Sequence, residues 1–270
     1  MFKRKKKEDS PKEASKSKRT MLDEKIRELY NDLFDLDSIK SAFLFSFLLA
    51  TLFLVIVLIL YSKHRNFLFW MYLIITPLYI LTTVVSFRAL NKFIRKVKAE
   101  HDKATKEREA EKKVQKFLED NLTEGYYLFK NIYTGYGDID AIVVGPTGIY
   151  MIEVKSNEGL IAENKEGYLS IIDGNTPNKN YRWQVAKQLS QVKKYLDNNT
   201  NMNTWVNPVL TFPFGLVMKD LVLESEHDKL KLPVMNEKEL LEYIYSNKQH
   251  NLSSDQIKMV CQALTEWQKD

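Results

Sequence analysis

Two uncharged, mostly apolar runs place the strongest constraint on how this chain can fold. They cover residues 41–61 and 67–87, and only residues 62–66 separate them. A helix of about 20 apolar residues crosses a hydrocarbon core of about 30 Å. Pro77 is tolerated in such a helix, because neighbouring helices satisfy the freed backbone carbonyl. Residues 41–90 are therefore predicted to form a transmembrane helical hairpin, with two buried helices of a soluble core as the alternative.

Basic residues flank both runs on the same side. Residues 1–19 hold nine Lys or Arg against three acidic residues, whereas the loop between the runs holds only Lys63 and Arg65. Five more basic residues follow the second run: Arg88, Lys92, Arg95, Lys96 and Lys98. Cytoplasmic flanks carry the excess of Lys and Arg. The sequence therefore predicts a multi-pass protein of the cell membrane, with two spans in the lipid bilayer and with both termini and the globular domain in the cytoplasm. The basic tail is expected to contact anionic lipid, with nucleic acid as the alternative.

Helical patterns flank the apolar runs on both sides. Residues 1–40 are predicted to be a basic disordered tail and then a short amphipathic helix on the membrane surface. The apolar stripe of this helix is Leu22, Ile26, Leu29, Leu33 and Leu36. Residues 91–120 contain no Gly or Pro and are predicted to form a charged linker helix. Its last turns carry an apolar stripe that is expected to dock onto a domain, namely Ala110, Val114, Phe117 and Leu118.

Beyond Gly125 the hydrophobic period changes to two. Strand patterns occur at residues 126–133, 138–144, 149–155, 168–173, 207–218 and 231–235, and helical patterns at 180–197, 236–246 and 253–268. Residues 121–270 are therefore predicted to form a cytoplasmic domain of the α/β class, an α+β sandwich. This domain has 15 Lys and Arg against 19 Asp and Glu, so the overall charge of +5 comes from the N-terminal part. Its charge alone does not favour strong binding to nucleic acid.

The stretch GDIDAIVVGPTGIYMIEVKS, residues 137–156, places acidic side chains and a lysine inside a predicted β-hairpin. GPTG is a turn with proline at its second position, where φ is preset, and glycine at its fourth. A hairpin symmetric about this turn pairs Asp140 with Glu153 and Asp138 with Lys155. Because side chains alternate along a strand, all four are expected to project from one face.

Facing carboxylates need compensation, because like charges directly opposite each other on a sheet are destabilising. Mg²⁺ supplies it, since this ion is held by one or two carboxylates together with water and substrate phosphate. The compact charge of Lys155 suits a water or phosphate oxygen beside such an ion. The alternative is a polar face exposed to solvent, with Asp138 and Lys155 as a surface ion pair.

The same residues resemble a known motif. Asp140, followed after twelve residues by Glu153-Val154-Lys155, looks like the D…ExK core of the PD-(D/E)xK nuclease superfamily. The string DIDAIVVGPTGIYMIEVKSNEGLI is similar to the nuclease-related domain known as NERD, over about residues 105–215. Ala141 stands where members of that family often carry a His. The resemblance implies a restriction-endonuclease-like core, with a central mixed sheet flanked by helices, which hydrolyses phosphodiesters in DNA or RNA.

The resemblance also implies a metal site in the hairpin. Asp140, Glu153 and the backbone carbonyl of Val154 would hold Mg²⁺, or Mn²⁺ in its place. Lys155 would orient or activate the attacking water.

Flanking helices are implied to complete this site. Glu111 is the upstream acid in the family pattern, and Gln184 or Gln188 would steady water or phosphate. The two glutamines are four residues apart and therefore share one helix face. A solvated helix surface is the alternative for all three residues.

The leading hypothesis is a membrane-anchored, cytoplasmic nuclease-like protein with Mg²⁺-dependent activity. The alternative is a catalytically idle adaptor of the same family, tethered to the inner membrane, which binds nucleic acid or a protein. A structural tether that self-associates through residues 88–120 ranks last, because this segment lacks sustained apolar heptads. The choice between DNA and RNA and the oligomeric state stay open.

Overall fold

The computed structural model describes residues 21–61, 67–134, 137–163, 169–172, 181–225, 228–247 and 250–269. The chain divides into two compact units, one of Leu22–Thr105 and one that contains Lys106–Asp270. The predicted basic tail over residues 1–20 and the predicted loop over residues 62–66 lie outside the described residues.

Two long helices make up the first unit. Helix α1 spans Met21–Tyr61, and helix α2 spans Phe67–Asn121 and continues into the second unit. The predicted amphipathic segment is the first part of α1 and not a separate helix. Its buried Leu29 packs with Val97 and Ala104 of α2, and the other members of its stripe pack around them. The stripe therefore packs against α2, with Leu29 buried and the other four side chains partly buried.

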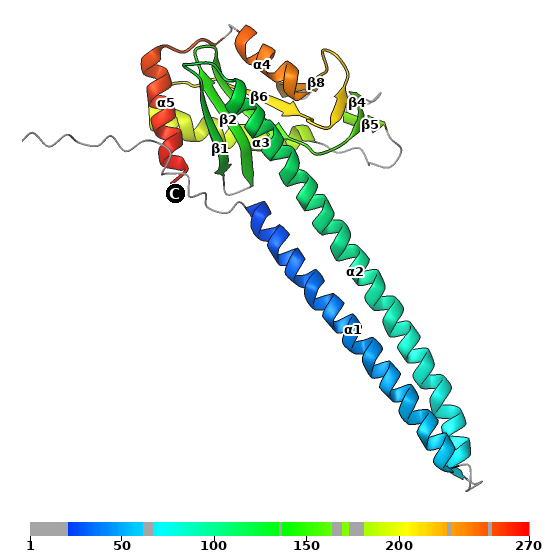
Figure 1. The fold of residues 1–270 in the computed structure, drawn as a ribbon. Coiled ribbons are helices and arrows are strands. Elements are labelled where there is room, and N and C mark those ends of the chain that lie inside the picture. The colour runs from blue at the N-terminus through cyan, green and yellow to red at the C-terminus, as the bar shows by residue number, and fades with distance from the viewer. Residues whose placement is uncertain are drawn as a thin grey trace, which may run out of the picture. The chain divides into compact units, whose positions relative to one another are not determined.

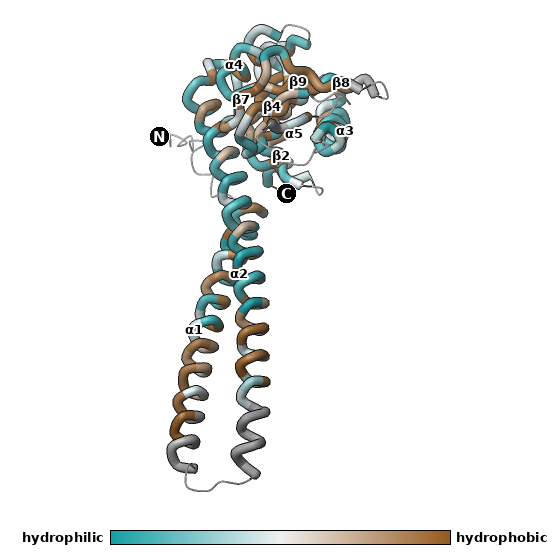
Figure 2. Tube along the Cα trace, turned by 90° about the vertical axis from the view of Figure 1, so that its right-hand side faces the viewer, coloured by the Kyte–Doolittle hydropathy of each residue, from teal (hydrophilic) through white to brown (hydrophobic). Residues whose placement is uncertain are grey.

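The predicted transmembrane hairpin is not supported by the structure. In the parts of the chain that are described, no helix carries an apolar stretch long enough to cross a bilayer. The hydrophobic segments of α1 and α2 are visible in Figure 2, but side chains over residues 57–75 lie outside the description.

A six-stranded mixed sheet forms the centre of the second unit, in the order β1-β2-β3-β6-β9-β8 (Figure 1). Its strands are β1 (Tyr127–Tyr133), β2 (Asp138–Gly145), β3 (Gly148–Val154), β6 (Val206–Thr211), β8 (Val222–Ser225) and β9 (Asp228–Met235). The strands β3, β6 and β9 run parallel, and the other neighbours pair antiparallel. A second sheet has the order β5-β4-β7, from β4 (Gly159–Glu163), β5 (Leu169–Ile172) and β7 (Gly215–Val217).

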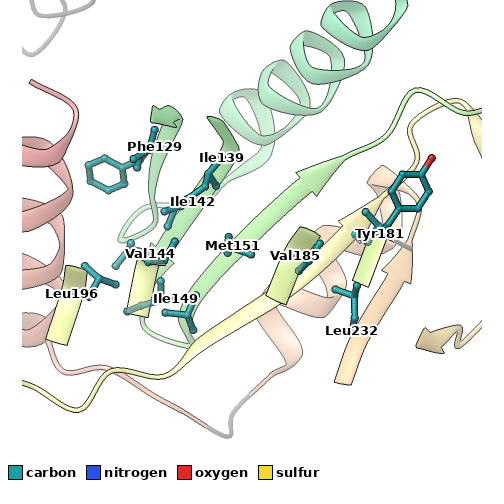
Figure 3. Close-up of a cluster of buried hydrophobic side chains, with 14 of the residues drawn as sticks. Phe129, Ile139, Ile142, Val144, Ile149, Met151, Tyr181, Val185, Leu196 and Leu232 are labelled. Carbon is teal, nitrogen blue, oxygen red and sulfur yellow. The ribbon is translucent and has the colours of Figure 1, made fainter. Parts of the chain in front are cut away.

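Helices cover both faces of the large sheet. Helices α3 (Tyr181–Thr200) and α5 (Ser254–Trp267) share one hydrophobic cluster with it, part of which Figure 3 shows around Met151 and Val185. The end of α2 and α4 (Glu237–Ser246) share the other cluster, through Val114, Leu118 and Leu240 among others. The predicted α/β fold with a central mixed sheet flanked by helices is therefore confirmed.

The sequence predicted where helices α4 and α5 begin more accurately than it predicted the short strands. Asn236 and Ser253 cap α4 and α5, and each forms a capping box with the residue three positions later. The strands β4 and β8 are not among the predicted strands. Both are short; β4 pairs in parallel with the distant β7, and β8 forms a hairpin with β9, so local periodicity carries little signal for them.

Truncating Leu118 is expected to destabilise the second unit, because this side chain is fully buried between α2 and the sheet. The Leu118→Ala variant of the full-length protein should lose about 2 to 5 kcal/mol of unfolding free energy in urea titrations followed by near-ultraviolet circular dichroism. Leu216→Ala is the control, since Leu216 is 74% exposed, and it should stay within about 0.5 kcal/mol of the parent. Equal losses in both variants would contradict docking of α2 on the sheet.

Candidate functional site

The β2–β3 hairpin positions the two central carboxylates. Its register runs from Gly145 opposite Gly148 to Ala141 opposite Ile152, as the symmetric turn predicts. The residues just beyond this ladder are Asp140 and Glu153. Both are buried, at 7% and 4% exposure. The alternative of a solvent-exposed polar face is therefore wrong for this pair.

The Asp140 carboxylate takes part in the backbone bonding of the hairpin. The Val154 N–H donates to Asp140 Oδ2 over 2.6 Å. Elsewhere in the ladder, strand N–H groups donate to strand carbonyls. Just past the Ala141–Ile152 pair, the Asp140 carboxylate takes the place of such a carbonyl. The bond keeps Asp140 at the end of β3, next to Glu153.

The Glu153 carboxylate lies between a lysine and a glutamine. Its Oε1 accepts a hydrogen bond from Lys155 Nζ at 2.5 Å and another from Gln184 Nε2 at 2.7 Å. Lys155 Nζ also donates to Gln184 Oε1 at 3.3 Å, which closes a three-membered network. Glu153 Oε2 is buried and has no hydrogen-bond partner. The structure therefore brings Glu153, Lys155 and Gln184 together, as the sequence predicts.

An aromatic side chain that the sequence analysis did not single out supports Lys155. The Lys155 ammonium lies 5.2 Å from the ring centroid of Tyr181, the first residue of α3. The Tyr181 hydroxyl donates to Asn157 Oδ1 at 2.8 Å. Tyr181 lies three residues before Gln184, and this helical spacing was the available signal.

The remaining predicted residues lie around the carboxylates. Gln188 is buried, and its Nε2 donates to the Asp138 carbonyl at 3.1 Å, while its Oε1 has no partner. Glu111 of α2 accepts from Arg108 at 3.0 Å, and its charge interacts with those of Asp138, Asp140 and Glu153. The Gln188 side chain therefore contacts the backbone of β2, whereas the Glu111 carboxylate belongs to the acidic cluster.

Gln115 and Asn131 form a second support that the sequence analysis missed. The buried Gln115 Nε2 donates to the Asp140 carbonyl at 2.8 Å and to Asn131 Oδ1 at 3.0 Å. Asn131 has φ of 54° within β1, a left-handed conformation that is uncommon for a non-glycine residue. Gln115 lies four residues after Glu111 on α2. This spacing places both residues on the same face of the helix, so the sequence could have predicted Gln115 on the docking face.

Burial and crowding of negative charge set the electrostatics of the site. Burial, with Glu153 and Glu111 nearby, raises the pKa of Asp140 well above its usual range. Burial also raises the pKa of Glu111 to about 6, although Arg108 opposes the shift. Burial would lower the pKa of Lys155, but Glu153 and Asp140 outweigh it and raise that pKa. The cluster therefore crowds several carboxyl groups around one lysine, and this favours the protonated forms of Asp140 and Glu111.

The donor set suits a hard divalent cation. Carboxylate and carbonyl oxygens are what Mg²⁺ prefers, and Glu153 Oε2 is a buried acceptor without a donor. Among the described residues, no group of three or more His, Cys, Asp and Glu side chains is arranged to hold a metal. The predicted set has two carboxylates, of Asp140 and Glu153, with the Val154 carbonyl as the third ligand.

The fold and the site thus define an α/β domain with buried carboxylates and a lysine at the end of a central hairpin. Residues 106–213 match the family model of the nuclease-related domain, NERD. The matched segment includes α3 and every acidic and glutamine residue described above, and it supports a nuclease-related function. A search of curated proteins and a search of solved structures each found no match to the chain.

The raised pKa of Glu111 predicts a pH dependence of stability. The folded protein keeps a proton that the unfolded chain releases between pH 4.5 and about 6. The free energy of unfolding should therefore fall as pH rises through this window, by about 2 kcal/mol from this group. Urea titrations of the full-length protein in EDTA should show a smaller fall for Glu111→Gln. Glu109→Gln, at an exposed position of the same helix, should behave like the parent, and an unchanged fall in Glu111→Gln would contradict the assignment.

Proposed function

We propose that the domain is a restriction-endonuclease-like nuclease that hydrolyses phosphodiester bonds of DNA or RNA with Mg²⁺, or with Mn²⁺ in its place. The observation that carries this proposal is the buried pair Asp140 and Glu153, with Lys155 bonded to Glu153 and with one carboxylate oxygen lacking a donor. Burying two carboxylates next to each other is costly unless a cation compensates them. The family match over residues 106–213 supports the same reading.

Each residue has a role in the proposed reaction. Asp140, Glu153 and the Val154 carbonyl would hold the cation, and when bound there it lowers the pKa of water and stabilises developing charge. Gln184 orients Glu153 and Lys155 through a hydrogen bond to each of them. Gln188 would steady water or phosphate at the edge of the cluster, and Glu111 would accept a hydrogen bond from water there.

Lys155 acts as a cation in this proposal. Its pKa is raised because Glu153 and Asp140 outweigh the effect of burial. A protonated lysine donates hydrogen bonds and cannot accept a proton. Lys155 therefore orients the attacking water or a phosphate oxygen.

The full-length protein is expected to cleave end-labelled DNA or RNA oligonucleotides in Mg²⁺ or Mn²⁺ and to be inactive in EDTA. Lys155→Ala and Asp140→Asn should lower the cleavage rate at least about 100-fold. Lys231→Ala is the control, because Lys231 is an exposed lysine paired with Glu224 on the β8–β9 hairpin. Circular dichroism should show that all variants are folded. Cleavage that persists unchanged in Lys155→Ala and Asp140→Asn would refute the proposal.

A non-catalytic adaptor is the second candidate. The observation in its favour is that Lys155 and Gln184 already satisfy Glu153 Oε1. The negative charge of residues 121–270 also limits attraction to phosphate. Calorimetric titration with Mg²⁺ and Mn²⁺ separates the two: the nuclease requires binding heat that Glu153→Gln removes, and the adaptor shows none at millimolar metal.

We also propose that residues 41–61 and 67–87 attach the protein to the cell membrane, with the nuclease-related domain on the cytoplasmic side. Many large apolar side chains of this unit are exposed: Leu44, Phe45, Leu48, Leu49, Leu52, Val55, Ile56, Leu78, Leu81 and Val85. Soluble monomeric proteins rarely expose extended apolar surface. The basic residues of 88–98 suit contact with anionic headgroups.

Membrane attachment predicts that the protein stays with the membrane pellet after alkaline carbonate extraction. Replacing two exposed leucines, Leu48→Lys with Leu52→Lys, should release it into the supernatant, because a charged side chain costs about 2.5 kcal/mol or more at the bilayer centre. Lys25→Ala with Lys103→Ala, two changes in the polar part of the unit, should leave it in the pellet. Recovery of the parent protein in the supernatant would exclude attachment.

A further inference from the structure

Helix α3 carries an aromatic and basic stripe beside the candidate site. Trp183 is 66% exposed, and the Lys187 ammonium lies 5.2 Å from its ring centroid. Lys194 is also exposed, and it is eleven residues, about three helical turns, from Trp183. The three side chains therefore lie along one face of the helix.

This stripe is next to the residues that contact the carboxylates. Trp183 is followed by Gln184, which bonds Glu153 and Lys155. Lys187 is followed by Gln188, which bonds the Asp138 carbonyl. Successive side chains of a helix point about 100° apart, so the stripe lies on the solvent side of α3, beside the helix face that carries Gln184 and Gln188.

The charge of the domain indicates what kind of ligand this stripe fits. Duplex binding depends mainly on phosphate neutralisation, and residues 121–270 carry 19 acidic against 15 basic residues. An exposed indole offers a different source of affinity, since base–aromatic stacking contributes about 1 to 3 kcal/mol per base. Stacking needs an open base face, and the bases of a duplex already stack on one another.

We propose that the stripe of Trp183, Lys187 and Lys194 binds an unpaired nucleic-acid strand. A base stacks on Trp183, the two lysines contact backbone phosphates, and a neighbouring phosphodiester lies at Asp140 and Glu153. This inference rests on the proposed nuclease function, and it names single-stranded DNA or RNA as its substrate class.

Binding can be measured apart from cleavage. Fluorescence anisotropy of the full-length protein in EDTA, with labelled single-stranded DNA, single-stranded RNA and a DNA duplex of equal length, should show tighter binding of the single strands. Trp183→Ala should weaken single-strand binding about 5- to 150-fold, and Trp183→Tyr should retain most of it. Lys187→Gln and Lys194→Gln should each reduce the slope of log affinity against log salt by about 0.7.

Trp205→Ala is the matched control, because Trp205 is 57% exposed and lies outside α3; it should bind like the parent. Equal affinity for duplex and single strand, parent-like binding by Trp183→Ala, or no binding to any oligonucleotide would overturn the proposal. Binding that depends on Trp183, together with no cleavage in Mg²⁺ or Mn²⁺, would support the stripe and refute the nuclease activity. Cleavage that Trp183→Ala leaves unchanged on both single strands and duplex would refute the stripe alone.

Discussion

The hydrogen bond from the Val154 N–H to the Asp140 carboxylate is the interaction on which the candidate site depends. The register of β2 with β3 ends at Ala141 and Ile152, and beyond it the carboxylate satisfies an N–H that would otherwise be buried without a partner. The bond also holds Asp140 beside Glu153 in spite of their repulsion, which adds to the effect of burial in raising the pKa of Asp140. A backbone donor thus stabilises an arrangement that like charges oppose.

Residues from both helical layers meet at this point of the sheet. Gln184 comes from α3 on one face, and Glu111 comes from α2 on the other. The site lies at the carboxyl end of β3, which runs parallel to β6, and open α/β sheets commonly bind ligands at such ends. Gln115 adds a link from α2 to the Asp140 carbonyl. Helix packing on both faces therefore determines how the acids are held.

The hairpin could be predicted from sequence because its geometry is local. The GPTG turn sets the register, and the register brings Asp140 and Glu153 together. The alternative of an exposed Asp138–Lys155 ion pair is wrong in its exposure, since Lys155 is largely buried and bonds Glu153. The pairing of β4 with β7 and the links from Gln115 to Asn131 and Asp140 depend on segments that are far apart in the chain. No local pattern encodes them.

The sequence by itself determined the hairpin, the capped helices α4 and α5, the apolar segments of the first unit, and which residue types gather around the D…ExK pattern. These follow from turn chemistry, side-chain alternation and capping, which act over a few residues. Only the tertiary structure decided that the carboxylates are buried, that Lys155 lies between Glu153, Gln184 and Tyr181, and that Trp183 stays exposed beside them. The reason is that burial and pKa depend on packing between α2, α3 and the sheet, and this packing joins residues as far apart in the sequence as Ala110 and Met235.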